Sequence, residues 1–228
     1  MSTIADNIGL VSQRILAAAD AVQRDASSIH LLAVSKTKPA QAVREAYAAG
    51  LHDFGENYLQ EALGKQADLT DLPLSWHFIG PIQSNKTRAI AENFAWVHSV
   101  DRLKIAQRLS EQRPADLPSL NICIQVNVSG EASKSGCTPA DLPALATAIS
   151  ALPRLKLRGL MAIPEPTEDR AEQDAAFATV RDLQASLNLP LDTLSMGMSH
   201  DLESAIAQGA TWVRIGTALF GARDYGQP

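Results

Sequence analysis

Short apolar runs rich in β-branched residues alternate along this chain with longer stretches in which apolar positions recur every three or four residues. Such alternation is typical of βα units that build a parallel sheet. The short runs predict strands at 29–35, 52–56, 76–80, 96–100, 121–128, 155–163, 193–197 and 211–216. The longer stretches predict helices that include 39–50, 85–94, 101–112, 139–152, 168–187 and 201–209. A further helix is predicted at the N-terminus, beginning at residue 2 or 3.

The order of these elements indicates an α/β fold. Eight strands, seven intervening helical segments and an extra N-terminal helix match a (β/α)8 TIM barrel at the small end of that fold's size range. No low-complexity tract or Pro/Gly-rich linker divides the sequence, so residues 1–228 are expected to form a single domain. The alternative is an open doubly wound sheet, which usually has fewer strands in a chain of this length.

Charge and hydropathy narrow the classes of partner. The formal net charge is −5 at pH 7, whereas nucleic-acid binding requires a basic face, so no nucleic-acid partner is expected. No apolar run is long enough to span a bilayer, and the first residues lack the basic and apolar segments of an export signal. We therefore expect neither a membrane span nor export. A monomer is expected because the sequence shows no apolar surface beyond the one that the core requires.

The cysteines and histidines give no sign of a disulfide or metal framework. Cys123 lies in an apolar predicted strand and is expected to be an inert core thiol, whereas Cys137 lies in a loop and is expected to be exposed. Both fit a reducing, cytoplasmic setting. The five histidines are scattered without the spacing of metal ligands, so no metal site is expected.

In a barrel of this kind, functional residues lie at the carboxyl ends of the strands and in the loops that follow. At those positions the sequence has Lys36, Asn57, Ser199, Arg214, Gly216 and Thr217. Ser199 precedes a predicted helix, where free N–H groups favour an anion, and the loops after the last two strands are the recurrent phosphate site of this fold. The simpler alternative is that Ser199 only caps a helix and Gly216 only forms a turn.

Two lysines follow the first predicted strand, in the stretch LLAVSKTKP. The usual fate of such a side chain is an ammonium group that extends into solvent. Lys36, however, directly follows the buried run and is expected to point into the barrel mouth. Desolvation and nearby cations there favour the neutral amine, which forms a Schiff base with a carbonyl group. Lys38 is expected to be more exposed, so Lys36 is the preferred nucleophile.

A lysine, a phosphate site and a nearby arginine together indicate pyridoxal 5'-phosphate as the cofactor. Its aldehyde would bond to Lys36, and Arg214 would reach its ring nitrogen. Its phosphate would contact Ser199, Gly216 and Thr217. Because a guanidinium group cannot accept a proton in a protein, the ring nitrogen would stay unprotonated and the ring would be a poor electron sink.

Seven motifs stand in order along the chain: AVSKTKP, FGENYLQEA, WHFIGPIQSNKTR, HSVDR, VNVSGEASKSG, RGLMAIP and MGMSHDLESAIAQGATWVRIGTALFG. They resemble the motifs of the pyridoxal-phosphate homeostasis protein family, and the resemblance runs from about residue 5 to residue 223. It implies a single (β/α)8 barrel similar to the N-terminal domain of bacterial alanine racemase, without that enzyme's second domain. It also implies a Schiff base at Lys36 and cofactor contacts for Ser199, Arg214, Gly216 and Thr217, with Asn57 close by.

These residues leave three classes of function. The resemblance implies a non-catalytic protein that buffers pyridoxal phosphate or delivers it to apo-enzymes, in vitamin B6 homeostasis. The alternative is an amino-acid racemase, which needs a second acid or base opposite Lys36. Tyr47 and Tyr58 lie in predicted helical segments and Tyr225 lies in the tail, so none is an obvious candidate. The third class is an aldolase-type enzyme that uses Lys36 directly on a carbonyl substrate, without a cofactor.

Overall fold

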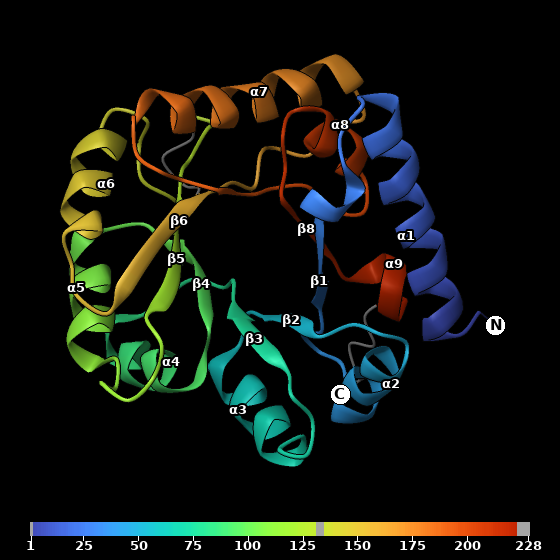
Figure 1. Cartoon of the computed structure of the whole chain (residues 1–228), viewed down its shortest axis with the longest axis horizontal. Helices are drawn as coiled ribbons and strands as arrows, with labels where there is room; N and C mark the ends of the chain where they lie inside the picture. Colours follow the sequence, from blue (N-terminus) through green and yellow to red (C-terminus); the bar gives the residue numbers. More distant parts are fainter. Residues whose placement is uncertain (1, 131–134, 223–228) are drawn as a thin grey trace, which may run out of the picture.

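Eight parallel strands close into a barrel in which each strand pairs with the next along the chain and the last pairs with the first (Figure 1). The structure, a computed structural model, describes residues 2–130 and 135–222. The strands in this part are β1 His30–Val34, β2 Asp53–Glu56, β3 Ser75–Phe78, β4 Trp96–Val100, β5 Leu120–Gln125, β6 Leu155–Met161, β7 Thr193–Ser195 and β8 Trp212–Ile215. Most strand residues are buried because helices cover the outer face of the sheet and side chains fill its interior.

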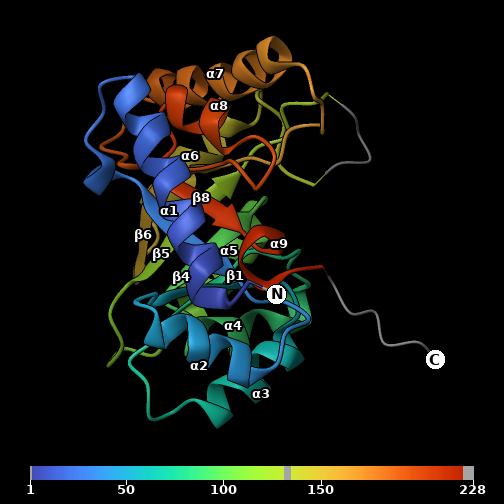
Figure 2. The ribbon, with the colours of Figure 1, turned by 90° about the vertical axis from the view of Figure 1, so that its right-hand side faces the viewer.

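Helices surround the barrel (Figure 1). They are α1 Ile4–Ala21, α2 Ala40–Ala48, α3 Leu59–Asp68, α4 Thr87–Asn93, α5 Leu103–Gln112, α6 Leu142–Ser150, α7 Arg170–Ser186, α8 Leu202–Ala207 and α9 Thr217–Phe220, with 3-10 turns η1 Ala26–Ser28 and η2 Ser84–Lys86. Figure 2 shows α1 running along one flank of the barrel, where it packs against α8 and α9. Across the described ranges, every helix is too short or too polar to traverse a lipid bilayer.

The predicted strands are all confirmed, and the closed barrel is observed rather than the open sheet. The largest difference is at β5, which ends at Gln125 rather than at residue 128. The N-terminal helix begins at Ile4, slightly later than predicted, because the Thr3 hydroxyl accepts the Asp6 N–H and the Asp6 carboxylate accepts the Thr3 N–H. The assignment of residues 1–228 to one domain stays a prediction, since it includes positions outside the described part.

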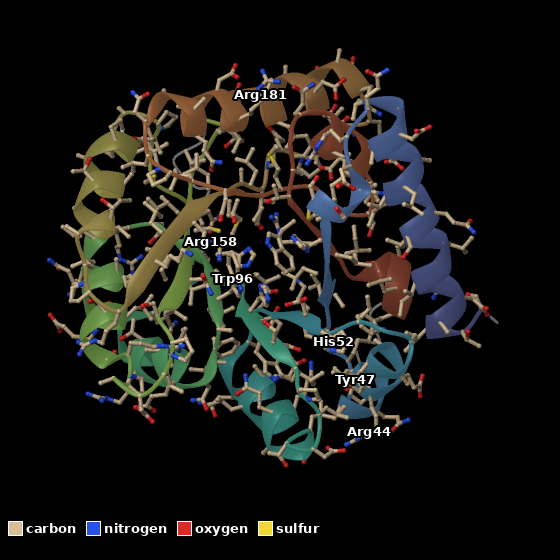
Figure 3. All side chains as sticks on the ribbon, in the orientation of Figure 1. Arg44, Tyr47, His52, Trp96, Arg158 and Arg181 are labelled. Carbon is tan, nitrogen blue, oxygen red and sulfur yellow. The ribbon has the colours of Figure 1, made fainter. Side chains whose placement is uncertain are left out.

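A small apolar cluster fills the interior of the barrel, apart from the larger core between the strands and the helices. Its members are Leu32, Val34, Ile79, Trp96, Cys123, Met161 and Trp212. Side chains alternate between the two faces of a strand, so Leu32 and Val34 point inward while Ala33 joins the outer core. At the amino end of the strands, the guanidinium carbon of Arg158 lies 4.7 Å from the centre of the Trp96 ring (Figure 3). Because side chains fill the interior, a binding site is expected at the carboxyl ends of the strands.

Both cysteines are buried. Cys123 lies in the interior cluster, as predicted, but the expectation that Cys137 is exposed is wrong. The Cys137 N–H donates to the carbonyl oxygen of Gln125, and its own carbonyl accepts from the N–H of Asn127, which draws the loop onto the end of β5. Burial raises the pKa of the Cys123 thiol to about 12 and that of Cys137 to about 11, so neither thiol is activated.

Candidate functional site

A cavity of about 280 Å³ opens at the carboxyl end of the barrel. Its lining contains all six residues selected from the sequence, namely Lys36, Asn57, Ser199, Arg214, Gly216 and Thr217. Val34, Ile79, Ile163, Met198 and His200 complete the lining. Arg214 lies in β8, and the other five residues follow β1, β2, β7 or β8. The first two strands are distant in sequence from the last two, and the pairs meet because the barrel closes between β8 and β1. The structure therefore places them together, while their role toward a cofactor remains a prediction.

The residue before Lys36 is held by a buried ion pair. Nζ of Lys65, on α3, lies 2.6 Å from the carbonyl oxygen of Ser35 and 2.7 Å from Oε1 of Glu56. The Ser35 hydroxyl donates to the same Glu56 oxygen at 2.5 Å. Burial raises the pKa of Glu56, and its contacts with Lys65 and Ser35 oppose that shift. The pair fixes the end of β1 from inside the protein.

The residue after Lys36 is held by the same ammonium group through a second carboxylate. The Thr37 N–H donates to Oε1 of Glu61 at 2.6 Å, and Nζ of Lys65 lies 2.6 Å from that oxygen. Thr37 has a left-handed backbone conformation, with φ 65°, which is rare for a β-branched residue. The hydrogen bond to Glu61 thus stabilises a sharp turn directly after Lys36.

Sequence reasoning passed over Lys65 as a functional position. A signal was present, because Leu59, Ala62 and Lys65 recur at a spacing of three and form the buried face of α3. A lysine in such a face requires a buried partner. Glu56, at the end of the strand predicted at 52–56, was a carboxylate that could have been proposed as this partner.

Asn57 lies in the cavity wall directly beneath the chain that follows β3. Gly80 packs so closely on it that an added Cβ would lie 2.3 Å from the Asn57 carbonyl oxygen. Only glycine fits this approach. Oδ1 of Asn57 is buried and has no hydrogen-bond partner among the described residues. An unpaired buried acceptor in a cavity wall suits a ligand that brings a donor.

The loop that carries Ser199 is fixed from two sides. Oδ1 of Asp201 accepts the Met198 N–H at 2.6 Å, and Asp201, rather than Ser199, is the N-cap residue of α8. From the outside, Arg14 of α1 donates to the Ser199 carbonyl oxygen at 3.0 Å and pairs with Glu203 at 2.8 Å. The extra N-terminal helix therefore positions one wall of the cavity.

Arg214 forms the buried floor of the cavity and is only 5% exposed. Its Nη1 donates to Oγ of Ser195 at 2.9 Å, and its Nη2 donates to the carbonyl oxygen of Ala162 at 3.0 Å. Burial lowers the pKa of Arg214 to about 10, and the charge of Asp201 opposes that shift. The guanidinium group stays positive at neutral pH, where it donates hydrogen bonds and accepts none.

Lys38 is absent from the described lining of the main cavity. It borders a smaller hollow of about 30 Å³ together with Lys36, Gly216 and Thr217, and its Nζ donates to the carbonyl oxygen of Ala222 at 2.7 Å. The geometry thus favours Lys36 as the lysine that faces the cavity.

Comparison with known proteins gives one consistent family. The model of the alanine racemase N-terminal domain matches residues 12–224. A pyridoxal phosphate homeostasis protein of Pseudomonas aeruginosa is 77% identical over 228 residues, which cover 100% of this chain and 99% of the relative. The structure of PipY from Synechococcus elongatus with PLP bound is 45% identical, with a TM-score of 0.84 over 96% of this chain and 100% of that one. An alanine racemase from Corynebacterium glutamicum is 18% identical, with a TM-score of 0.71 over 99% of this chain and 63% of that one, and shares the fold.

Proposed function

The chain belongs to the pyridoxal phosphate homeostasis proteins, within the family of the alanine racemase N-terminal domain, and from this premise we propose that it binds pyridoxal 5'-phosphate at the barrel mouth. Lys36 holds the cofactor as a Schiff base, and the protein buffers or delivers it in intracellular vitamin B6 homeostasis without catalytic turnover. One observation carries the proposal: an amine, an arginine and a set of small hydroxyl-bearing and glycine residues line the same cavity.

The wall at the ends of β7 and β8 suits a phosphate group. Ser199 and Thr217 offer hydroxyl groups, and Gly216 has no side chain to block the backbone. A Cβ added at Gly216 would lie 3.2 Å from the carbonyl oxygen of Val34, so a larger residue would crowd this wall. We assign Ser199, Gly216 and Thr217 to the phosphate, and Asn57 to a polar group of the ligand nearer β2.

The environment of Arg214 favours binding over carbanion chemistry. Pyridoxal phosphate supplies an aldehyde and a ring that withdraws electrons when its nitrogen is protonated. Arg214 is positive at neutral pH and has no proton-accepting atom, so it supports an unprotonated ring nitrogen. In such a site the aldehyde of the cofactor still forms a Schiff base, but the ring withdraws electrons less strongly.

The described cavity wall holds no tyrosine that could act as the second base of a racemase, and His200 is its one imidazole. Tyr47 packs edge-on against His52 at the surface of α2 (Figure 3), and Tyr58 is 55% exposed. Neither lines the cavity, and Tyr225 lies outside the described residues. The curated relatives are homeostasis proteins, and the likeness to racemases is distant.

The test is to add pyridoxal phosphate to the purified protein, record its absorbance, reduce it with borohydride and map the labelled peptide by mass spectrometry. We expect a new absorbance band that reduction fixes onto Lys36. Lys36→Ala should abolish the label, whereas Lys104→Ala, at an exposed position on α5, should retain it. A label on Lys38 would reassign the tether. No band and no adduct would contradict the proposal and favour an enzyme that uses Lys36 without a cofactor.

We further propose that the protein acts in the cytoplasm as a monomer and passes the cofactor to apo-enzymes. Two buried free thiols are consistent with a reducing compartment. Light scattering of the purified protein with and without pyridoxal phosphate tests the monomer, and a mass of twice 24.4 kDa would contradict it.

A further inference from the structure

Five polar side chains form a continuous hydrogen-bonded line through the barrel, here called the interior network: Asp53, His77, His98, Ser195 and Arg214. Asp53 Oδ1 lies 3.0 Å from His77 Nε2, and His77 Nδ1 lies 2.9 Å from His98 Nε2. His98 Nδ1 lies 2.7 Å from Ser195 Oγ, which accepts from Arg214. Both histidines and the serine are fully buried. The network connects the amino end of β2 to the floor of the cavity.

The hydrogen positions follow from the two ends of the network. A guanidinium group only donates, so Ser195 Oγ accepts from Arg214. Its own hydrogen is donated to His98 Nδ1, because the opposite order would leave His77 Nε2 without a hydrogen beside the Asp53 carboxylate. Nδ1 of His98 must then carry no hydrogen. A neutral imidazole has one N–H, so His98 carries it on Nε2 and donates it to His77.

The same reasoning fixes the next ring and ends at the carboxylate. His77 accepts at Nδ1, so its hydrogen lies on Nε2 and is donated to Asp53, which only accepts when ionised. Ser75 Oγ, 3.2 Å from the same nitrogen, can share it. Reasoning from the Asp53 end gives the same order. Any other arrangement of two neutral rings would place two donors or two acceptors face to face in a buried site.

Both rings are in surroundings that favour the neutral form. Burial lowers the pKa of His77, although Asp53 opposes the shift, and it lowers the pKa of His98 well below the usual value. Trp96 stacks on His77 with ring centres 5.4 Å apart, and Trp212 packs against the same ring at 4.8 Å. These contacts leave the rings little freedom to rotate away from the network.

We propose that Ser195, His98 and His77 are positioning residues that hold the Arg214 guanidinium group through hydrogen bonds that all point from Arg214 toward Asp53. With Nη1 anchored on Ser195 and Nη2 on Ala162, the group is kept in one orientation at the cavity floor. Its remaining N–H groups are then available to the ligand's ring nitrogen. The effect on the ligand rests on the proposed function, but the order of the hydrogens does not.

A matched pair of substitutions at His98 separates a directional network from simple packing. An asparagine amide oxygen can occupy the Nδ1 position and accept from Ser195, whereas a glutamine nitrogen can occupy the Nε2 position and donate to His77. We expect His98→Asn to change the affinity for pyridoxal phosphate by less than about threefold, and His98→Gln to weaken it about tenfold, since only the second leaves Ser195 without its acceptor. Equal effects of the two substitutions, or none, would overturn the positioning role.

The hydrogen order is tested on the unaltered protein without any ligand. Nitrogen-15 chemical shifts of labelled histidine rings distinguish the Nδ1–H, Nε2–H and doubly protonated forms, and the His98→Asn spectrum assigns His98 by its missing signals. We expect both buried rings to be neutral and to carry the hydrogen on Nε2 at pH 7. An Nδ1–H or doubly protonated ring at either position would overturn the inference. Because no ligand is present, this result is independent of whether pyridoxal phosphate binds.

Discussion

At the scale of single residues, the position of Lys36 depends on neighbours that never reach the cavity. Ser35 is held through its carbonyl and hydroxyl groups, and Thr37 through its N–H, so the backbone on both sides of the lysine is fixed. Lys65 joins these contacts, because its ammonium group donates both to the Ser35 carbonyl oxygen and to the Glu61 carboxylate that accepts from Thr37. The buried ammonium group of Lys65 thus fixes the backbone from which the Lys36 amine extends into the cavity wall.

Removing this ammonium group should destabilise the protein strongly. Lys65→Met leaves the Glu56 carboxylate buried without its cation, and we expect the free energy of unfolding to fall by about 3 kcal/mol, measured by urea denaturation. The double substitution Glu56→Gln with Lys65→Met should recover part of the loss, because no uncompensated charge remains.

Lys104→Met provides the control for this pair. Lys104 is exposed on α5, so its loss should change stability by less than about 0.5 kcal/mol. If Lys65→Met behaves like this surface substitution, the ion pair does not hold the strand end.

At the scale of elements, the strands were predictable because most of them are short runs rich in apolar residues and largely buried. The helix α3 was harder to place, since Lys65 and Gly64 interrupt its apolar pattern, and α9, over Thr217–Phe220, is too short to show a period. The cavity residues were predictable because strand ends converge in any barrel of this type.

The interior network was not predictable from local patterns. His98 and Ser195 lie 97 positions apart and meet only when the barrel closes. Arg214 was selected from the sequence only as a cofactor contact, and Asp53, His77, His98 and Ser195 lie in separate strands with no spacing that links them. Likewise, the burial of Cys137 depends on backbone hydrogen bonds to the end of β5, which the pattern of apolar positions does not predict.

The close packing of the chain after β3 on the end of β2 gives a prediction at this scale. Gly80→Ala places a methyl group against the Asn57 backbone, so the two segments must separate. We expect stability to fall by about 1–3 kcal/mol, and pyridoxal phosphate to bind more weakly because Asn57 moves. Urea denaturation and an absorbance titration measure the two effects.

Gly64→Ala is the matched control for this substitution. Gly64 lies in α3, and a Cβ added there meets no atom within 4 Å. Alanine at this helical position should raise stability by about 0.5–1 kcal/mol. A Gly80→Ala variant as stable as the Gly64→Ala variant would show that the two segments have room to adjust.

At the scale of the whole molecule, the barrel interior carries charge at both ends and neutral polar groups between them. The Asp53 side chain is 34% exposed near the amino ends of the strands, and Arg214 is buried beneath the cavity. The two neutral imidazoles align their dipoles between these charges, which favours both the carboxylate and the guanidinium group. The network therefore links the stability of the barrel to the protonation state of its histidines.

This link predicts that the protein loses stability on mild acidification. Burial lowers the folded-state pKa of His77 and His98, so between that value and about 6.5 the unfolded chain binds more protons than the folded one. The free energy of unfolding should therefore decrease as pH falls from 7 to 5, by up to about 1.4 kcal/mol per pH unit for each ring. Glu56 and Asp201, whose pKa values are raised, act in the opposite direction, so the histidine effect is isolated by comparing variants.

The comparison uses His98→Asn, which removes one buried ring, and His52→Gln, which removes an exposed one. Urea denaturation at several pH values between 7 and 5 should give a shallower loss of stability for His98→Asn than for the unaltered protein. His52→Gln should retain the original slope, because it leaves the interior network intact. Parallel curves for His98→Asn and the unaltered protein would mean that His98 is not held neutral by the fold, and the hydrogen order of the network would have to be reassigned.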